Sequence, residues 1–172
     1  MHIRIAPGGV LAVLLAAACS PGVMAQDPAI AASATPGTIE LGWGPSDVTL
    51  VAPPGNSVAA RLKNIEAGRQ IYLTFVQAQA PSSSSTTFNV YLGLAANAAP
   101  GGTSDPHYVG TINFFNATAG HPIDMSLNVT ARVGALLAGG DIGDSVRVTI
   151  APAGGPSADA APRIGGVRLT AR

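Results

Sequence analysis

Charged side chains are scarce in this sequence, and neither sign dominates. Lys and Arg together number 9, Asp and Glu also number 9, and the formal net charge is +0 at pH 7. A protein that binds nucleic acid needs a basic stripe to neutralise phosphates, and the sequence contains none. It also lacks the runs of like charge that mark interaction tails. We therefore expect no nucleic-acid partner.

Cysteine is nearly absent, because Cys19 is the single cysteine of the chain. One cysteine cannot close an intramolecular disulfide, so the fold must hold without covalent cross-links. Histidine is also rare, with 3 in the whole sequence.

The few histidines and aromatic rings gather in one stretch, "HYVGTINFFNATAGH" at 107–121, which holds His107, Tyr108, Phe114, Phe115 and His121. One hypothesis is a metalloenzyme site built from the two histidines with Asp105 or Asp124. The histidines are too far apart for a helical pair, however, and no cysteine or further histidine joins them. We favour the other interpretation, a strand with its exit loop, and predict no metal and no cofactor.

Other catalytic patterns are missing as well. No G-x-S-x-G elbow occurs, and the serine cluster "PSSSS" has the composition of a loop. The carboxylates stand beside Gly, Pro or Ser, as turn-forming Asp residues do. The acidic run "DIGDS" lacks the ligands of a calcium loop. The sequence therefore predicts a protein that is not an enzyme.

The N-terminus has the pattern of an export signal. His2 and Arg4 precede the apolar run "GGVLAVLLAAA", which is too short to cross a bilayer, and small residues end at Ala25. We predict a signal peptide at 1–25, cleavage after Ala25, and a periplasmic or secreted protein. The alternative is a lipoprotein, because "LLAAAC" resembles a bacterial lipoprotein signal in which Cys19 carries the lipid anchor.

The remainder divides into a leader and one domain. Residues 26–46 are rich in small residues and Pro, which predicts a flexible leader or tether. Residues 47–172 form the predicted domain. In it, "ARVGALLAGG" at 131–140 indicates one short helix, and Gly165-Gly166 shifts an alternating pattern by one residue, as a β-bulge does.

Alternating apolar and polar residues between turn signals predict an all-β fold. The class is a small antiparallel β-sandwich or barrel, jelly-roll-like, with about seven or eight strands and at most one short helix. The expected strands lie at 48–51, 57–63, 70–79, 86–93, 108–115, 124–133, 144–152 and 163–171.

The order of these motifs resembles a known family, the C-terminal domain of polyphenol oxidases (plant tyrosinase and catechol oxidase) and of related bacterial tyrosinases. The resemblance covers about residues 47–172. It rests on "DVTLV" at 47–51, "FNVY" at 88–91, "VGTIN" at 109–113, the segment 131–144, "VRVTIAP" at 146–152 and "IGGVRL" at 164–169. The chain departs from the family at Thr87, where the family has Lys, and at "LLAGG", which replaces an acidic helix.

The resemblance implies a non-catalytic role. In tyrosinases this domain follows a dicopper domain held by six histidines, which this chain cannot supply. There the domain covers the copper entrance until it is removed. The resemblance thus implies a module that binds or shields a separately encoded dicopper oxidase chain, or helps it to fold or load copper. The alternative is a cell-surface or periplasmic ligand-binding or adhesive β-sandwich without an oxidase partner.

A shielding surface needs exposed apolar or aromatic groups. The candidates are Tyr108, Phe114, Phe115 and Trp43, each of which would otherwise be ordinary core. Adjacent residues of a strand point to opposite faces, so only one of Phe114 and Phe115 is expected to point outward.

Overall fold

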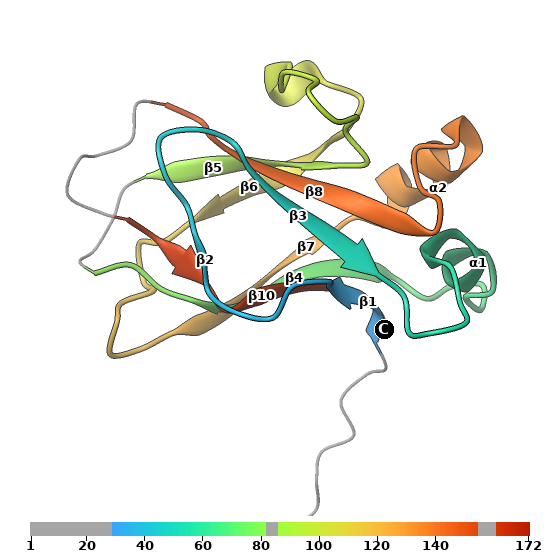
Figure 1. Cartoon of the computed structure of the whole chain (residues 1–172), viewed down its shortest axis with the longest axis horizontal. Coiled ribbons are helices and arrows are strands. Elements are labelled where there is room, and N and C mark those ends of the chain that lie inside the picture. The colour runs from blue at the N-terminus through green and yellow to red at the C-terminus, as the bar shows by residue number, and fades with distance from the viewer. Residues whose placement is uncertain (1–28, 82–85, 155–160) are drawn as a thin grey trace, which may run out of the picture.

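The computed structural model describes residues 29–81, 86–154 and 161–172. Within these ranges the chain forms ten strands, two α-helices and one 3-10 turn (Figure 1). The strands are β1 (Ala29–Ser33), β2 (Ile39–Glu40), β3 (Ser46–Val51), β4 (Ile71–Ala78), β5 (Thr87–Leu92), β6 (Tyr108–Asn113), β7 (Ile123–Asn128), β8 (Ser145–Pro152), β9 (Arg163–Ile164) and β10 (Gly166–Ala171). The helices are α1 (Val58–Lys63) and α2 (Thr130–Gly139), and the 3-10 turn is η1 (Gly102–Ser104). The predicted all-β class is confirmed.

Eight strands form one antiparallel sheet that curls until its two edges meet. Its strand order is β6-β5-β8-β3-β1-β10-β4-β7, and β2 pairs with β9 in a separate two-stranded sheet. The edge strands β6 and β7 contact each other without a backbone ladder between them. The sheet is therefore a nearly closed barrel with one open seam.

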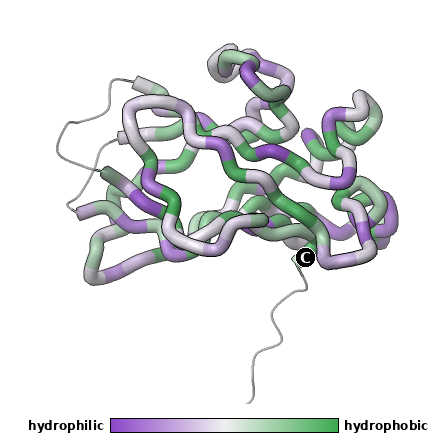
Figure 2. Tube along the Cα trace, in the orientation of Figure 1, coloured by the Kyte–Doolittle hydropathy of each residue, from purple (hydrophilic) through white to green (hydrophobic). Residues whose placement is uncertain are grey.

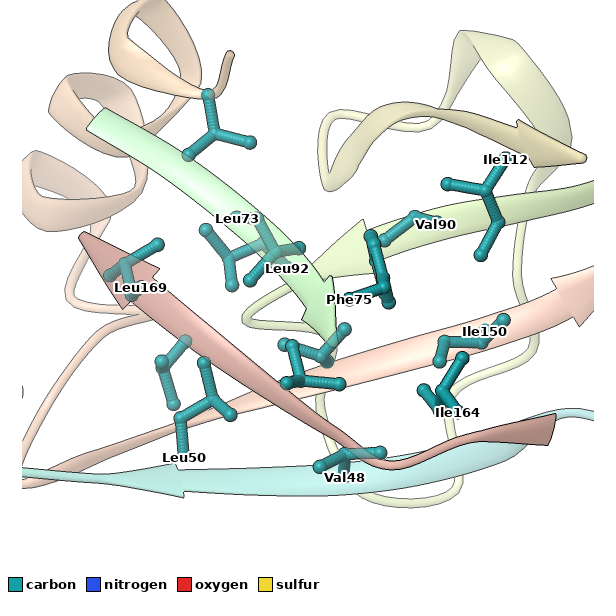
Figure 3. Close-up of a cluster of buried hydrophobic side chains, with 14 of the residues drawn as sticks. Val48, Leu50, Leu73, Phe75, Val90, Leu92, Ile112, Ile150, Ile164 and Leu169 are labelled. Carbon is teal, nitrogen blue, oxygen red and sulfur yellow. The ribbon is translucent and has the colours of Figure 1, made fainter. Parts of the chain in front are cut away.

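The inside of the curled sheet is filled by alternate apolar side chains. Figure 3 shows them converging from opposite strands, among them Phe75 of β4, Val90 of β5 and Leu169 of β10, each fully buried. This is the period of two that the sequence displays, because successive strand residues point to opposite faces. Each such side chain contributes about 1.5–3 kcal/mol by leaving water.

Helix α1 differs from the predicted strand at 57–63. Ser57 caps it by accepting a hydrogen bond from the Ala60 amide (N···Oγ 3.0 Å), and Val58 and Leu62 form its buried side. Apolar residues at 58, 60 and 62 fit a strand, but 58 and 62 also lie on one face of a helix. Ser57 as an N-cap, followed by helix-forming Ala, Arg, Leu and Lys, was the signal that decides between them.

Helix α2 confirms the predicted helix, and it shortens the strand expected at 124–133. The strand ends at Asn128, whose Oδ1 accepts from the Thr130 amide (3.1 Å) and so turns the chain into the helix. Gly140 ends the helix in the left-handed region at φ 82°, where its amide reaches the last carbonyls. No helix in the described ranges has the length and apolar character needed to cross a membrane.

Residues 29–46, expected to belong to a flexible leader, are instead structured. β1 pairs with both β3 and β10, so it lies in the middle of the main sheet. Leu41, just after β2, is buried and its amide donates to the Pro162 carbonyl (2.8 Å). The short side chains of "AIAAS" suit a strand that has a neighbouring strand on each side. Linkers have a similar composition, so composition alone does not distinguish the two.

The chain changes sheets at the predicted irregularity. β9 ends at Ile164 and β10 begins at Gly166. The Gly165 amide donates to the Val76 carbonyl (2.8 Å) while Gly166 lies opposite the same Val76. Two residues thus face one, the arrangement of a β-bulge, and both Ile164 and Val167 are buried on either side of it.

The strand register gives the barrel two distinct ends. One end, called here the loop end, gathers the starts of β3, β5, β7 and β10 and the ends of β4, β6 and β8. The other, the helix end, holds α1, α2, the β5–β6 connection, the start of β1 and the C-terminus. In Figure 1 the loop end lies on the left and the helices lie on the right.

The seam generates a stability prediction at Gly110. Its φ is 151°, and a Cβ there would lie 3.1 Å from Leu127 Cδ1 across the seam. Gly110→Ala should lower the free energy of unfolding by about 1–3 kcal/mol, because it combines backbone strain with a collision. Gly134→Ala in α2, where a Cβ meets nothing within 4 Å, should instead raise it by up to about 1 kcal/mol. Urea unfolding of both variants measures these changes in the free energy of unfolding. Equal changes in the two variants would contradict the close approach of β6 and β7 at Gly110.

Candidate functional site

The four aromatic candidates fall into different environments. Phe114 has 0% exposure and packs edge-to-face against Phe88, with ring centroids 5.8 Å apart, so it is core and cannot form a surface. Phe115 is 66% exposed, as is Trp43. The outward residue of the Phe pair is therefore Phe115.

Phe115 and Trp43 belong to the same end of the barrel. Trp43 lies in the connection between β2 and β3, and Phe115 lies in the connection between β6 and β7. The register places both connections at the loop end. Among the described residues, the other large apolar side chain that is exposed is Val51, at the far end of β3. The two rings define what we call the loop-end surface.

Tyr108 does not join this surface. It opens β6 near the helix end and lies on the outer face of the barrel, half-buried against Tyr91 with ring centroids 5.9 Å apart. Its hydroxyl bonds to Thr111 Oγ1 (2.7 Å). Tyr108 also packs against a small buried cluster formed by Tyr91, Leu94 and Ala151. Tyr108 is thus part of a second, external core.

The two histidines are separated by the length of β6. His107 precedes the strand and His121 follows it, so a strand of 6 residues lies between them, which corresponds to about 20 Å. His121 is exposed, and its amide donates to the Thr118 carbonyl (3.0 Å). The two rings cannot ligate one metal ion, which answers the question that their clustering in the sequence raises.

His107 instead joins two connections at the helix end. Its Nδ1 lies 3.1 Å from Asp105 Oδ1, and its Nε2 lies 3.8 Å from Asp141 Oδ2 in the turn after α2. Asp124, the other carboxylate considered for a metal, accepts from the Gln77 amide and pairs with Arg168 (3.3 Å). No group of three or more potential metal ligands occurs in the ranges that the structure covers.

Asp105 organises the β5–β6 connection. Its carboxylate accepts from the Gly101 amide (2.9 Å) and from the His107 amide (2.8 Å). Burial of Asp105 acts to raise its pKa, but these amides and the His107 ring together outweigh burial and hold the pKa below its usual value. These hydrogen bonds tie together the part of the connection from Gly101 to His107.

This geometry predicts an acid-sensitive contribution to stability. A depressed folded pKa stabilises the fold above the unfolded value of about 3.9, and the contribution is lost as the pH falls through the folded pKa. Asp105→Ala should lower the free energy of unfolding by about 1–3 kcal/mol at pH 7, because two amides lose their acceptor. The difference in the free energy of unfolding between Asp105→Ala and the unmodified protein should become smaller below pH 4.

The exposed Asp144, whose side chain makes no hydrogen bond in the described structure, provides the control. Asp144→Ala should change stability by less than about 0.5 kcal/mol. Denaturant unfolding between pH 7 and pH 3 measures both variants. If the loss of unfolding free energy in Asp105→Ala stays constant down to pH 3, this role of the carboxylate is refuted.

Comparison with known proteins identifies the fold. Latent apple tyrosinase matches with a TM-score of 0.54 and 19% identity, over 78% of this chain and 27% of that chain. Recombinant latent aurone synthase, a polyphenol oxidase, matches with a TM-score of 0.52 and 15% identity, over 80% of this chain and 25% of that chain. The fold resembles one part of a polyphenol oxidase. No protein-family model and no curated protein sequence matches the chain.

The extent of the match is informative. The chain covers about a quarter of each enzyme's length, which fits their C-terminal domain alone. The resemblance expected from the motif order is thus confirmed as a likeness of fold. The match fits a non-catalytic domain, because about three quarters of each enzyme's length has no counterpart in this chain.

Proposed function

We propose that this protein is a non-catalytic, exported module that binds a separately encoded dicopper oxidase chain and shields its active site. The observation that carries the proposal is the match of most of this chain to about a quarter of two polyphenol oxidases, both in their latent forms. A latent enzyme is one whose activity is held back. A separate chain with the same fold would supply such restraint in trans.

The small number of histidines in the sequence supports this role. A dicopper centre held by six histidines cannot be built from a sequence with 3. The two histidines of the domain lie at opposite ends of β6. The copper chemistry would therefore belong entirely to the partner, with this chain contributing contact surface.

The loop-end surface is the proposed contact. Trp43 and Phe115 are each 66% exposed, although burying such rings is favourable and water is a poor environment for them. Exposed aromatic side chains on rigid connections are the residues that most often dominate binding energy at protein interfaces. We infer that one or both rings enter the mouth of the partner's active site.

Export is part of the proposal and rests on residues 1–28, which lie outside the described residues. The signal peptide with cleavage after Ala25 and the lipid anchor on Cys19 remain alternatives. Either would deliver the domain beyond the cytoplasm. A lipid anchor would hold it, and any bound oxidase, at a membrane surface.

A second function uses the same end of the molecule. The ends of β4, β6 and β8 and the starts of β3, β5, β7 and β10 meet at the loop end. Clustered loops on a rigid β-scaffold are common binding sites, so a cell-surface module that holds a glycan or cell-wall ligand is the alternative. If the protein binds no glycan on a glycan array, this alternative is excluded.

The partner experiment uses a purified six-histidine copper oxidase that lacks a domain of this fold, and the coding sequences beside this one are the place to look for it. The two purified chains should form a 1:1 complex by size-exclusion chromatography, and diphenol oxidation should fall as this chain is added. Trp43→Ala and Phe115→Ala should each weaken binding about tenfold or more, since aromatic hot spots carry that share of affinity.

Val51→Ala is the matched control, because Val51 is an exposed apolar residue at the other end of β3. It should leave binding and inhibition unchanged. If the chains neither associate nor alter diphenol oxidation, the proposed function fails. An effect of Val51→Ala equal to those of the ring variants would show that the contact lies elsewhere.

A further inference from the structure

A hollow of about 380 Å³ opens at the helix end, between α1, the segment that follows it and the terminal strands β1 and β10. Ile30, Ile65 and Ala171 supply apolar surface to its lining. The polar part comes from Arg61, Arg69, Glu66 and two asparagine amides, at 56 and 64. Its volume lies within the range of small-molecule sites, about 300–1,000 Å³. Figure 2 shows that hydrophobic and hydrophilic residues alternate along the chain around α1.

Both guanidinium groups at this hollow are held in place by backbone carbonyls. Arg61 Nη2 donates to the Ala29 carbonyl at 3.2 Å, and Arg69 Nη2 donates to the Ala171 carbonyl at 3.0 Å. These carbonyls belong to the start of β1 and the end of β10, which are neighbours in the main sheet. The two cations are thus fixed relative to a rigid element, and less side-chain entropy is lost when a ligand binds.

The two guanidinium groups of the hollow form no ion pair within the described residues, and they outnumber the one carboxylate of the lining. No carboxylate lies within 4.0 Å of Arg61 or Arg69 among the described residues, although Glu66 lines the same hollow. The Arg61 Nε is buried and has no hydrogen-bond partner. Such groups are rare in folded proteins and call for an explanation. Arg147 and Arg168, in contrast, each pair with a carboxylate, although the Nε of Arg168 is likewise buried without a hydrogen-bond partner.

We propose that this hollow binds a small organic anion, a carboxylate attached to a short apolar group. The carboxylate would lie between the guanidiniums of Arg61 and Arg69, because guanidinium forks match carboxylate oxygens in geometry and charge. The apolar group would lie against Ile30 and Ile65. Two arginines oppose one glutamate there, so an anion is preferred over a neutral or cationic ligand.

This site is separate from the loop-end surface. It lies at the opposite end of the barrel, among the helices and the C-terminal strand. Binding there needs no oxidase partner and can be measured on this protein alone. Its failure would leave the proposed shielding role untouched, and the reverse also holds.

The test is a titration of the protein with benzoate, followed by calorimetry and by amide NMR shifts. Benzoate should bind at one site and shift amides of α1, the segment 64–70 and the end of β10. Arg69→Gln, which removes an exposed guanidinium, should weaken binding about tenfold or more, and Arg61→Gln should do likewise. Lys63→Gln is the control, because Lys63 is an exposed cation of α1 that does not line the hollow. It should change the affinity less than twofold.

Two further probes separate the parts of the ligand. Benzamide has the same ring without the charge, and inorganic phosphate has the charge without the ring. Each should bind at least tenfold more weakly than benzoate. The proposal is overturned if benzoate does not bind at millimolar concentration, if Lys63→Gln weakens binding as much as Arg69→Gln, or if either probe binds as tightly as benzoate.

Discussion

The packing of one apolar face inside a curled antiparallel sheet is the constraint on which the rest of the molecule depends. Phe75, Val90, Leu169 and their neighbours meet in the interior, and no cross-link replaces them. Because the sheet curls into a barrel, its strands begin and end at two opposite ends of the molecule. The position of Trp43, Phe115 and both histidines follows from this arrangement rather than from their spacing in the chain.

The same constraint places the two proposed binding sites at opposite ends of the barrel. The loop end carries exposed rings on connections whose neighbours are buried, such as Phe114 beside Phe115. The helix end carries fixed cations around a hollow and the Asp105–His107 contact. A small cluster of Tyr91, Leu94 and Ala151, with Tyr108 packed against it, is separate from the main core. A partner at one end therefore leaves the other accessible.

Much of the fold follows from alternation in the sequence, and the failures have physical causes. The strands around Phe75, Val90 and Val148 were predictable, because alternating apolar residues between turns have few other solutions. Segment 57–63 was misassigned, because positions 58 and 62 satisfy both periods. β1 was missed because small side chains enclosed in a sheet resemble a linker in composition. The exposure of Phe115 rather than Phe114 needed the structure, because both residues follow the end of β6 at Asn113, where strand alternation no longer applies. The arginine-lined hollow was not predictable, because its parts are brought together by the sheet from residues about 30 to 171.

The central claim is that the loop end contacts a dicopper oxidase. Hydrogen exchange of this protein, alone and in the presence of that oxidase, tests it most directly. The account predicts slower exchange in the connections at 41–45 and 114–122, with α1 and α2 unchanged. Protection confined to the helices, or no protection at either connection, would contradict it.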